Sequence, residues 1–309
     1  MFALWRSAAF CVYDWSLWRD MLVTSILPRA RRIAADFEQS PRQLLAKLPR
    51  RAKTLLIHLD ISDNAPFIAD AAEFISILTQ REIRVLNCRC RDIRKTTVQS
   101  HCIRLGLPSV TAAATGLDDE LLIVKSDLNS GGEREQKLSD AQKARFNLPA
   151  AGGRITGPAD YRVTRRADLP RDTWNDPHLV VEQYIKNTLG RFFRVYVALN
   201  AIVISEAYDD ALVKRMAGPI RRCNHRLWRH GELLHPQSAN DSKLPPRLLH
   251  TAGVFVDSFH VDYGAIDIVE SAAGDFYVVD VNKTPYWGDE KQAGLIEHLR
   301  LGFFTAKRR

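Results

Sequence analysis

The sequence has few of the features that mark secreted, membrane-spanning or zinc-binding proteins. Its five cysteines, Cys11, Cys88, Cys90, Cys102 and Cys223, are odd in number and include no CxxC pair. That pattern favours neither a disulfide framework nor a zinc site. No apolar run reaches the roughly 20 residues that a membrane helix needs, and we expect no secretory signal because its apolar core is missing. We therefore expect a cytoplasmic protein with no transmembrane segment.

Several common catalytic motifs are absent as well. The chain contains neither GxxxxGK[ST] nor GxGxxG, which argues against P-loop and Rossmann nucleotide sites. It also lacks GxSxG and any Cys/His signature of a covalent nucleophile. The basic stretch over residues 213–232 matches no recognised nucleic-acid module, so we expect no specific nucleic-acid partner.

The composition is that of an ordinary globular protein. Of the 309 residues, 46% are hydrophobic and 26% are charged. This length fits either one large domain or two to three lobes that share a core. The net charge of +8 suits an anionic partner such as a nucleotide, a nucleic acid or a membrane surface, without choosing among them.

Residues 1–52 are rich in aromatic side chains that charged residues interrupt. We interpret them as amphipathic helices followed by a basic linker at residues 47–53. We favour helices that pack against the main body or in a homodimer, because aromatic stripes are usually buried within the protein. A helix that lies on a membrane surface, anchored by Trp5, Trp15 and Trp18, is the alternative.

Residues 53–112 show alternating strands and helices. The apolar runs TLLIHL (54–59) and IRVLNC (83–88) flank a helix-period stretch, which is typical of a βαβ unit in a parallel sheet. A further helix then ends at Gly106, with Pro108 beyond it. Lys95 lies in the first turn of that helix, where it is either solvated or directed at a ligand.

Residues 113–185 contain a glycine-rich turn between two buried strands. The run LLIVKSDLNSGGERE (121–135) places Lys125 on a strand, and Gly131 and Gly132 follow in a turn that lets the backbone approach a ligand. Amides in such a turn can bind phosphate, although a lone turn of this kind is more often a surface hairpin. The second strand, HLVVEQYI, covers residues 178–185.

Residues 186–309 contain two hairpins. In the first, FFRVYVAL and AIVISEAY meet at Asn200, and Arg194 lies within an otherwise apolar strand. An unpaired guanidinium there would be costly, so a phosphate or a buried carboxylate should pair with it.

The second hairpin joins AIDIV to FYVVDV through a turn with Gly274. Alternation puts Asp280 and Asn282 on one face, and strand pairing can bring Asp267 near them. Three oxygen donors of this kind suit Mg²⁺. The alternative is a hairpin whose acids point to solvent.

This order of motifs resembles the ATP-grasp superfamily, and the resemblance covers residues 53 to 309. It implies an α/β (α+β) fold in which two α+β lobes hold ATP between them, preceded by a small parallel α/β lobe. The lobes would be residues 53–112, 113–185 and 186–309. The implied ATP-binding residues are Lys95, Lys125, Gly131, Gly132, Glu182, Gln183, Tyr184 and Ile185, the last four as a hinge against adenine.

The resemblance also implies an activity. Most relatives join a carboxylate to an amine through an acyl phosphate, with ATP and Mg²⁺, for which Mn²⁺ could substitute. Asp267, Asp280 and Asn282 would hold the metal, while Arg194, Lys214 and Arg215 would bind the transferring group. The substrates would be small-molecule or peptide carboxylates and amines.

Two other activities remain open. One is an ATP-dependent phosphotransferase that acts on a small molecule. The other is a non-catalytic ATP-binding or scaffold protein, which is favoured by Phe192, where many relatives have an aspartate, and by Asn187–Gly190, where an acid for the ribose is missing. The metal position also differs, because Asp280 replaces the usual glutamate.

Overall fold

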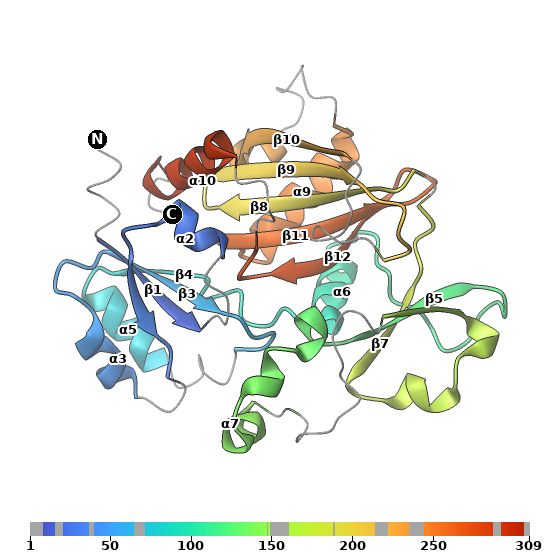
Figure 1. The fold of residues 1–309 in the computed structure, drawn as a ribbon, viewed down its shortest axis with the longest axis horizontal. Coiled ribbons are helices and arrows are strands. Elements are labelled where there is room, and N and C mark those ends of the chain that lie inside the picture. The colour runs from blue at the N-terminus through green and yellow to red at the C-terminus, as the bar shows by residue number, and fades with distance from the viewer. Residues whose placement is uncertain are drawn as a thin grey trace.

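Three β-sheets form the framework of the molecule (Figure 1). The structure is a computed structural model that describes residues 9–15, 21–36, 40–64, 72–146, 148, 161–187, 189–213, 222–234, 244–286 and 292–305. The mixed α/β architecture predicted from the sequence is confirmed. No helix within these ranges is long and apolar enough to cross a membrane.

The first sheet is parallel and begins earlier in the chain than predicted. Its order is β2-β1-β3-β4, and its strands are β1 (Phe10–Trp15), β2 (Arg31–Ala34), β3 (Thr54–Leu59) and β4 (Arg84–Leu86). The helical interpretation of residues 1–52 is therefore wrong for β1 and β2. Strand β1 is a short, largely buried apolar run, and periodicity cannot separate such a run from a buried helix. Strand β2 is a mostly exposed edge strand of four residues, RRIA, which is too short and too polar to show a strand pattern. Trp15 ends β1, whereas Trp5 and Trp18 lie outside the described residues.

Helices α3 (Pro41–Lys47) and α5 (Ala72–Gln80) share a core with this sheet. Helix α2 (Leu22–Ile26) packs between this sheet and the second sheet, and α6 (Lys95–Arg104) packs against the second sheet. The basic stretch interpreted as a linker thus follows directly on α3, whose N-terminus is closed by a Ser40–Gln43 capping box.

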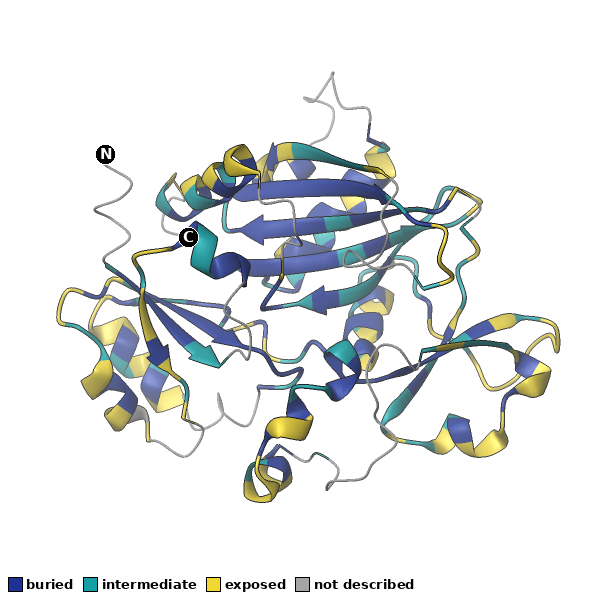
Figure 2. Cartoon of the chain, in the orientation of Figure 1, coloured by how far each residue is buried: buried dark blue, intermediate teal, exposed yellow. Residues whose placement is uncertain are grey.

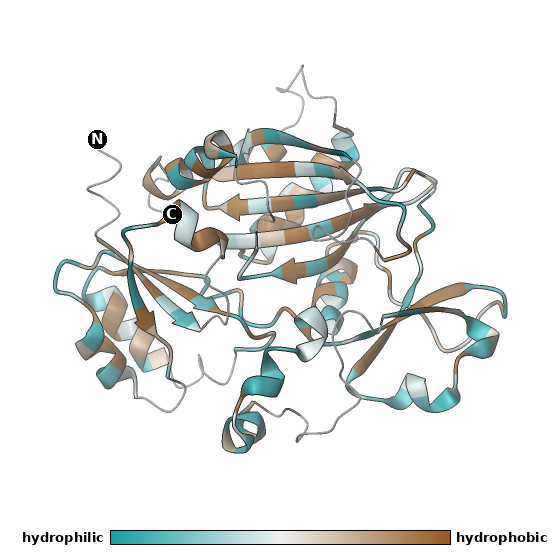
Figure 3. Ribbon diagram, viewed as in Figure 1, coloured by the Kyte–Doolittle hydropathy of each residue, from teal (hydrophilic) through white to brown (hydrophobic). Residues whose placement is uncertain are grey.

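The second sheet is antiparallel, has the order β10-β9-β8-β11-β12 and lies above the other two sheets in the view of Figure 1. Both predicted hairpins are confirmed within it. Its inner strands are dark blue in Figure 2 and mostly brown in Figure 3, because both faces are covered. The strands are β8 (Arg191–Ala198), β9 (Ala201–Tyr208), β10 (Arg222–Arg229), β11 (Tyr263–Glu270) and β12 (Phe276–Asn282).

Different elements cover the two faces of this sheet. The helices α6, α8 (His230–Leu234) and α9 (Pro246–Ser258) cover one face. The other face packs against α2, α10 (Ala293–Thr305) and the first sheet, where Leu56 and Leu86 share a core with Tyr263. This contact brings the carboxyl ends of the parallel strands toward the hairpin that carries the predicted metal ligands.

The third sheet is small, with the order β6-β5-β7. Its strands are β5 (Leu121–Ser126), β6 (Arg162–Arg165) and β7 (Leu179–Gln183). Short elements surround it: η2 (Asn129–Gly132), η3 (Glu135–Lys137), α7 (Asp140–Arg145), η5 (Arg166–Asp168) and η6 (Arg171–Asn175). This sheet faces β12 across the site described below.

Gly302 marks a close approach of α10 to the large sheet. A Cβ added there would overlap the Ala198 carbonyl oxygen and lie 2.6 Å from the Ala201 Cβ. We expect Gly302→Ala to lower the free energy of unfolding by about 1–3 kcal/mol through overpacking, measured by urea denaturation. Gly294→Ala is the matched control, because no heavy atom lies within 4 Å of its added Cβ. Equal losses in both variants would contradict this packing.

Candidate active site

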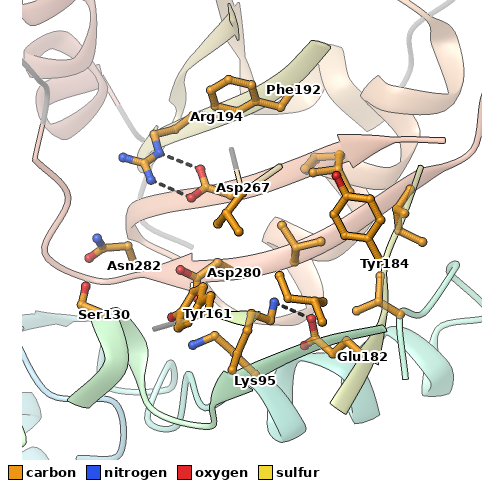
Figure 4. Close-up of a pocket in the computed structure, with 18 of the residues that line it drawn as sticks. Lys95, Ser130, Tyr161, Glu182, Tyr184, Phe192, Arg194, Asp267, Asp280 and Asn282 are labelled. Carbon is orange, nitrogen blue, oxygen red and sulfur yellow. Dashed lines mark hydrogen bonds and ion pairs between the residues drawn. The ribbon is translucent and has the colours of Figure 1, made fainter. Parts of the chain in front are cut away.

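A cavity of about 600 Å³ lies between the small sheet and the large sheet. Most of the residues predicted from the sequence line it, and Figure 4 shows how several of them converge. They are Lys95, Lys125, Glu182, Gln183, Tyr184, Ile185, Arg194, Asp267, Asp280 and Asn282. Lys214 and Arg215 lie outside the described residues.

One end of the cavity is formed by the segment that follows β7. The Gln183 N–H donates to the Val110 carbonyl at 2.7 Å, and the Tyr184 N–H donates to the Leu121 carbonyl at 2.9 Å. The Ile185 N–H makes no hydrogen bond with any described residue. The walls nearby are largely apolar and include Phe192, Ile123, Val269 and Val279. This end therefore suits a flat aromatic ring that accepts a hydrogen bond from one backbone amide.

Lys125 and Glu182 form a buried ion pair between β5 and β7. Their side chains are only 8% and 3% exposed, and Glu182 Oε2 contacts the Lys125 Nζ (Figure 4). The other carboxylate oxygen, Oε1, is buried and has no partner in the described part of the chain. Buried polar atoms are rarely left unpaired, so this oxygen is available to a ligand N–H or O–H.

Lys95 is the first residue of α6, and it is almost completely buried. Its Nζ donates to the Leu128 carbonyl at 2.8 Å and lies 5.8 Å from the centre of the Tyr161 ring. The solvated alternative for this lysine is therefore wrong. The two lysines place positive charge in the middle of the cavity.

The glycine-rich turn is held inside the protein rather than at its surface. Ser130, Gly131 and Gly132 have φ values of 48°, 71° and 77°, a region in which glycine is favoured. Asn129 N–H donates to Ser62 Oγ at 2.7 Å, and the Ser62 hydroxyl donates to Glu135. The surface-hairpin alternative is thus wrong. Ser130 lines the cavity, whereas the two glycines lie behind it and shape the turn.

Three charged residues lie directly opposite one another on β8, β11 and β12. The register pairs Arg194 with Asp267 and Asp267 with Asp280. The Arg194 guanidinium binds both oxygens of Asp267, each at 2.6 Å (Figure 4). The sequence left either a phosphate or a buried carboxylate as the partner of Arg194, and the structure shows the carboxylate of Asp267. Burial alone would lower the pKa of Arg194, but Asp267 outweighs it and raises that pKa.

Asp280 has a carboxylate oxygen that needs a partner. Its Oδ1 is shielded from water and makes no hydrogen bond to any described residue. Burial raises the pKa of this carboxyl, and the charge on Asp267 adds to the rise. The adjacent Asn282 Oδ1 accepts the Thr284 N–H at 2.8 Å. These acids do not simply point to solvent at the edge of the hairpin, because Asp267 pairs with Arg194 and Asp280 Oδ1 is shielded from water.

The oxygen donors at this end fit a hard cation such as Mg²⁺. The described ranges contain no group of three or more His, Cys, Asp or Glu side chains that could hold a metal. A metal held by Asp267, Asp280 and Asn282 would therefore need further ligands from a nucleotide and water, which is how Mg²⁺ is commonly bound.

The sequence did not predict the residues at the far end of the cavity. Asp60 follows β3, and its carboxylate accepts from Arg134 Nε at 2.8 Å and from Thr284 Oγ at 2.7 Å. Ser130, Arg134, Thr284, Met21 and Tyr286 also line this end. Asp60 could have been found from its position at the carboxyl end of a parallel strand, because ligands of α/β sheets bind at that end.

Comparison with known proteins gives matches among solved structures alone. No family model and no curated protein matches the sequence. The ATP-grasp ligase PsnB, complexed with a minimal precursor, is 13% identical over 94% of each chain, with a TM-score of 0.50. PsnB complexed with a phosphomimetic variant of that precursor, Mg and ADP is 11% identical over 94% of this chain and 93% of its own, with a TM-score of 0.51.

A ligase from Chryseobacterium gregarium is similar to the same extent. This RiPP-associated ATP-grasp ligase, in complex with ADP and a leader and core peptide, is 13% identical over 97% of each chain, with a TM-score of 0.51. At such identities the likeness concerns the arrangement of the elements alone.

Proposed function

We propose that this chain, which has the ATP-grasp fold, is an ATP- and Mg²⁺-dependent ligase that joins a carboxylate to an amine through an acyl phosphate. The observation that carries this proposal is that one cavity contains an apolar slot, two buried lysines, the Arg194–Asp267 pair and the unpaired oxygen of Asp280. These groups match, in order along the cavity, the parts of a metal-bound nucleoside triphosphate.

The nucleotide would bind with its base in the apolar slot. The Ile185 N–H would donate to the adenine ring, and Glu182 Oε1 would accept from the base or the sugar. Lys125 and Lys95 would then face the phosphates. Glu182 fixes Lys125 in place, so its charge is already oriented before a ligand binds.

Asp267, Asp280 and Asn282 would hold Mg²⁺, which supplies neutralisation of phosphate charge when bound. The Asp280 oxygen without a partner supports this assignment. Arg194 would stabilise the transferring group, because its two contacts with Asp267 fix the plane of the guanidinium. Lys214 and Arg215 remain proposed contacts of that group, since they follow Leu212 and Val213, which line the cavity.

The substrates would enter at the end of the cavity that contains Asp60 and Arg134. PsnB and the Chryseobacterium gregarium ligase are described as complexes with precursor, leader or core peptides. We therefore include peptides among the carboxylates to be tested, beside small-molecule acids.

The experiment is a screen of carboxylate and amine pairs for ADP release, with hydroxylamine included as a nucleophile that traps acyl phosphates. ADP release together with an amide or hydroxamate is the expected result. ADP release with a phosphorylated hydroxyl product would instead identify a phosphotransferase. Tight ATP binding without turnover across the panel would favour a non-catalytic protein.

A further inference from the structure

Asp60 presents a fixed carboxylate to the far end of the cavity. Its N–H donates to the Trp15 carbonyl at 2.9 Å, so its backbone continues the pairing of β1 with β3. Its Oδ2 accepts from Arg134 Nε at 2.8 Å, and its Oδ1 accepts from Thr284 Oγ at 2.7 Å. An ionised carboxylate oxygen can accept two hydrogen bonds. Each oxygen of Asp60, which lines the cavity, can therefore accept another from a ligand.

The side chains around Asp60 have an excess of negative charge. Arg134 also donates from Nη1 to Glu133 Oε2 at 2.7 Å, so one guanidinium lies between two carboxylates. These three side chains together have a net negative charge. Asp60 is only 8% exposed, whereas Glu133 is 44% exposed and more strongly screened by solvent. A cationic group of a ligand is therefore favoured here, and Asp60 is its stronger partner.

This carboxylate is linked to the metal end of the cavity through Thr284. The Thr284 hydroxyl donates to Asp60, and the Thr284 N–H donates to Asn282 Oδ1 at 2.8 Å. One residue thus bridges the side chains of Asp60 and Asn282. In the proposed reaction the acyl phosphate would form near the metal, where Asp280 has its unpaired oxygen. A substrate group bound to Asp60 would lie next to that intermediate.

An apolar wall accompanies the carboxylate. Met21 and Tyr286 form an antiparallel bridge, and the Leu22 N–H donates to the Pro285 carbonyl at 3.0 Å beside it. Both Met21 and Tyr286 line the cavity. Met21 is buried, whereas Tyr286 is partly open to solvent. A ligand at this end can therefore place an apolar stem against the wall and its cationic group against Asp60.

We propose that Asp60 binds the amine substrate as an alkylammonium ion whose stem lies against Met21 and Tyr286, so that the site selects aliphatic primary amines. This role rests on the proposed ligase function. The ammonium group donates to a carboxylate that Arg134 and Thr284 hold in place, and hydrogen bonds between charged groups are roughly twice as strong as neutral ones. Amines that are uncharged at neutral pH lack this contribution.

The test compares two acceptors of nearly the same shape. At neutral pH n-butylamine is an ammonium ion, whereas O-propylhydroxylamine is uncharged. Both are assayed with ATP, Mg²⁺ and a carboxylate that gives turnover in the screen. The wild-type KM should be about tenfold or more lower for butylamine.

Asp60→Asn should remove this preference. Asparagine keeps the shape of the side chain and an acceptor for Thr284, but it removes the charge. The KM for butylamine should rise about tenfold or more, and the KM for O-propylhydroxylamine should stay within a few-fold of wild type. A merely structural role for Asp60 would change both KM values alike.

Glu133→Gln tests the same charge from outside the cavity. Glu133 is half-exposed and is not among the residues that line the cavity, so this variant should fold. Its KM should rise about two- to fivefold for butylamine alone, because only a screened charge is lost. The control is Asp119→Asn, because Asp119 is exposed and does not line the cavity. It should match wild type with both acceptors.

The outcomes separate this site from the ligase function. Wild-type KM values that do not favour butylamine, or equal changes for both acceptors in Asp60→Asn, would overturn the ammonium site while leaving the ligase standing. Turnover with O-propylhydroxylamine but not with butylamine would overturn it as well. Absence of wild-type turnover with every acceptor, hydroxylamine included, would remove the ligase function and this site with it.

Discussion

Asp280→Asn is expected to reduce Mg²⁺-dependent turnover by about 100-fold or more and to stabilise the protein when no ligand is present. The substitution keeps the shape of the side chain but removes its negative charge. A metal bound at Asp267, Asp280 and Asn282 would lose the negative charge of Asp280, whose Oδ1 has no other partner in the described part of the chain, and would be left with a weaker, neutral amide oxygen. Without metal, the same charge is a cost, because burial raises the pKa of Asp280.

The pH dependence of this cost has a definite sign. The folded protein binds the Asp280 proton more tightly than the unfolded chain does, because its pKa is raised. The cost is therefore absent below the ordinary aspartate pKa and grows as the pH rises through the raised value. The stability gain of Asp280→Asn, measured by urea denaturation at a series of pH values, should appear across that window and vanish in acid.

Asp275→Asn is the matched control, because Asp275 lies in the turn of the same hairpin and pairs with Arg247 at the surface. It should leave both turnover and stability near wild type. An Asp280→Asn variant that keeps full Mg²⁺-dependent activity would contradict the metal assignment.

Arg194→Met is expected to destabilise the protein by about 3 kcal/mol. The side chains of Arg194 and Asp267 are only 15% and 22% exposed, and the guanidinium supplies a partner to both oxygens of Asp267. Removing one member of a buried pair leaves the other charge uncompensated. Adding Asp267→Leu should recover most of the lost stability, because it removes that charge. Both variants should lack turnover.

Urea denaturation measures these differences, with Arg222→Ala as the control. Arg222 is exposed on β10, so its loss should change stability by no more than about 0.5 kcal/mol. The pairing would be refuted by an Arg194→Met variant that is no less stable than Arg222→Ala.

Features carried by short-range patterns could be predicted from the sequence. Alternation within one hairpin is enough to place Asp280 and Asn282 on one face, and the turn brings Asp267 beside them. Lys125 and the segment Glu182–Ile185 follow from the order of buried strands. The fold class follows from the same order, and the structure confirms it.

Features that depend on distant contacts could not be predicted. The partner of Arg194 was left open, because the register between β8 and β11 joins residues that lie 73 positions apart. Arg134 follows the glycine-rich turn and reaches the cavity through its ion pair with Asp60, 74 positions away, which no local motif reports. The strand β1 was interpreted as helical, since a short apolar run buried on both faces has no diagnostic period.

The most direct test of the central claim is a thermal-shift titration with ATP and Mg²⁺ together, ATP with a chelator, Mg²⁺ alone and buffer. A ligand that binds only the folded state stabilises it by about 2.7 kcal/mol at a hundredfold excess over Kd. We predict a clear rise in Tm that requires ATP and Mg²⁺ together. No shift with any of these additions would contradict the assignment of the cavity as a metal-nucleotide site.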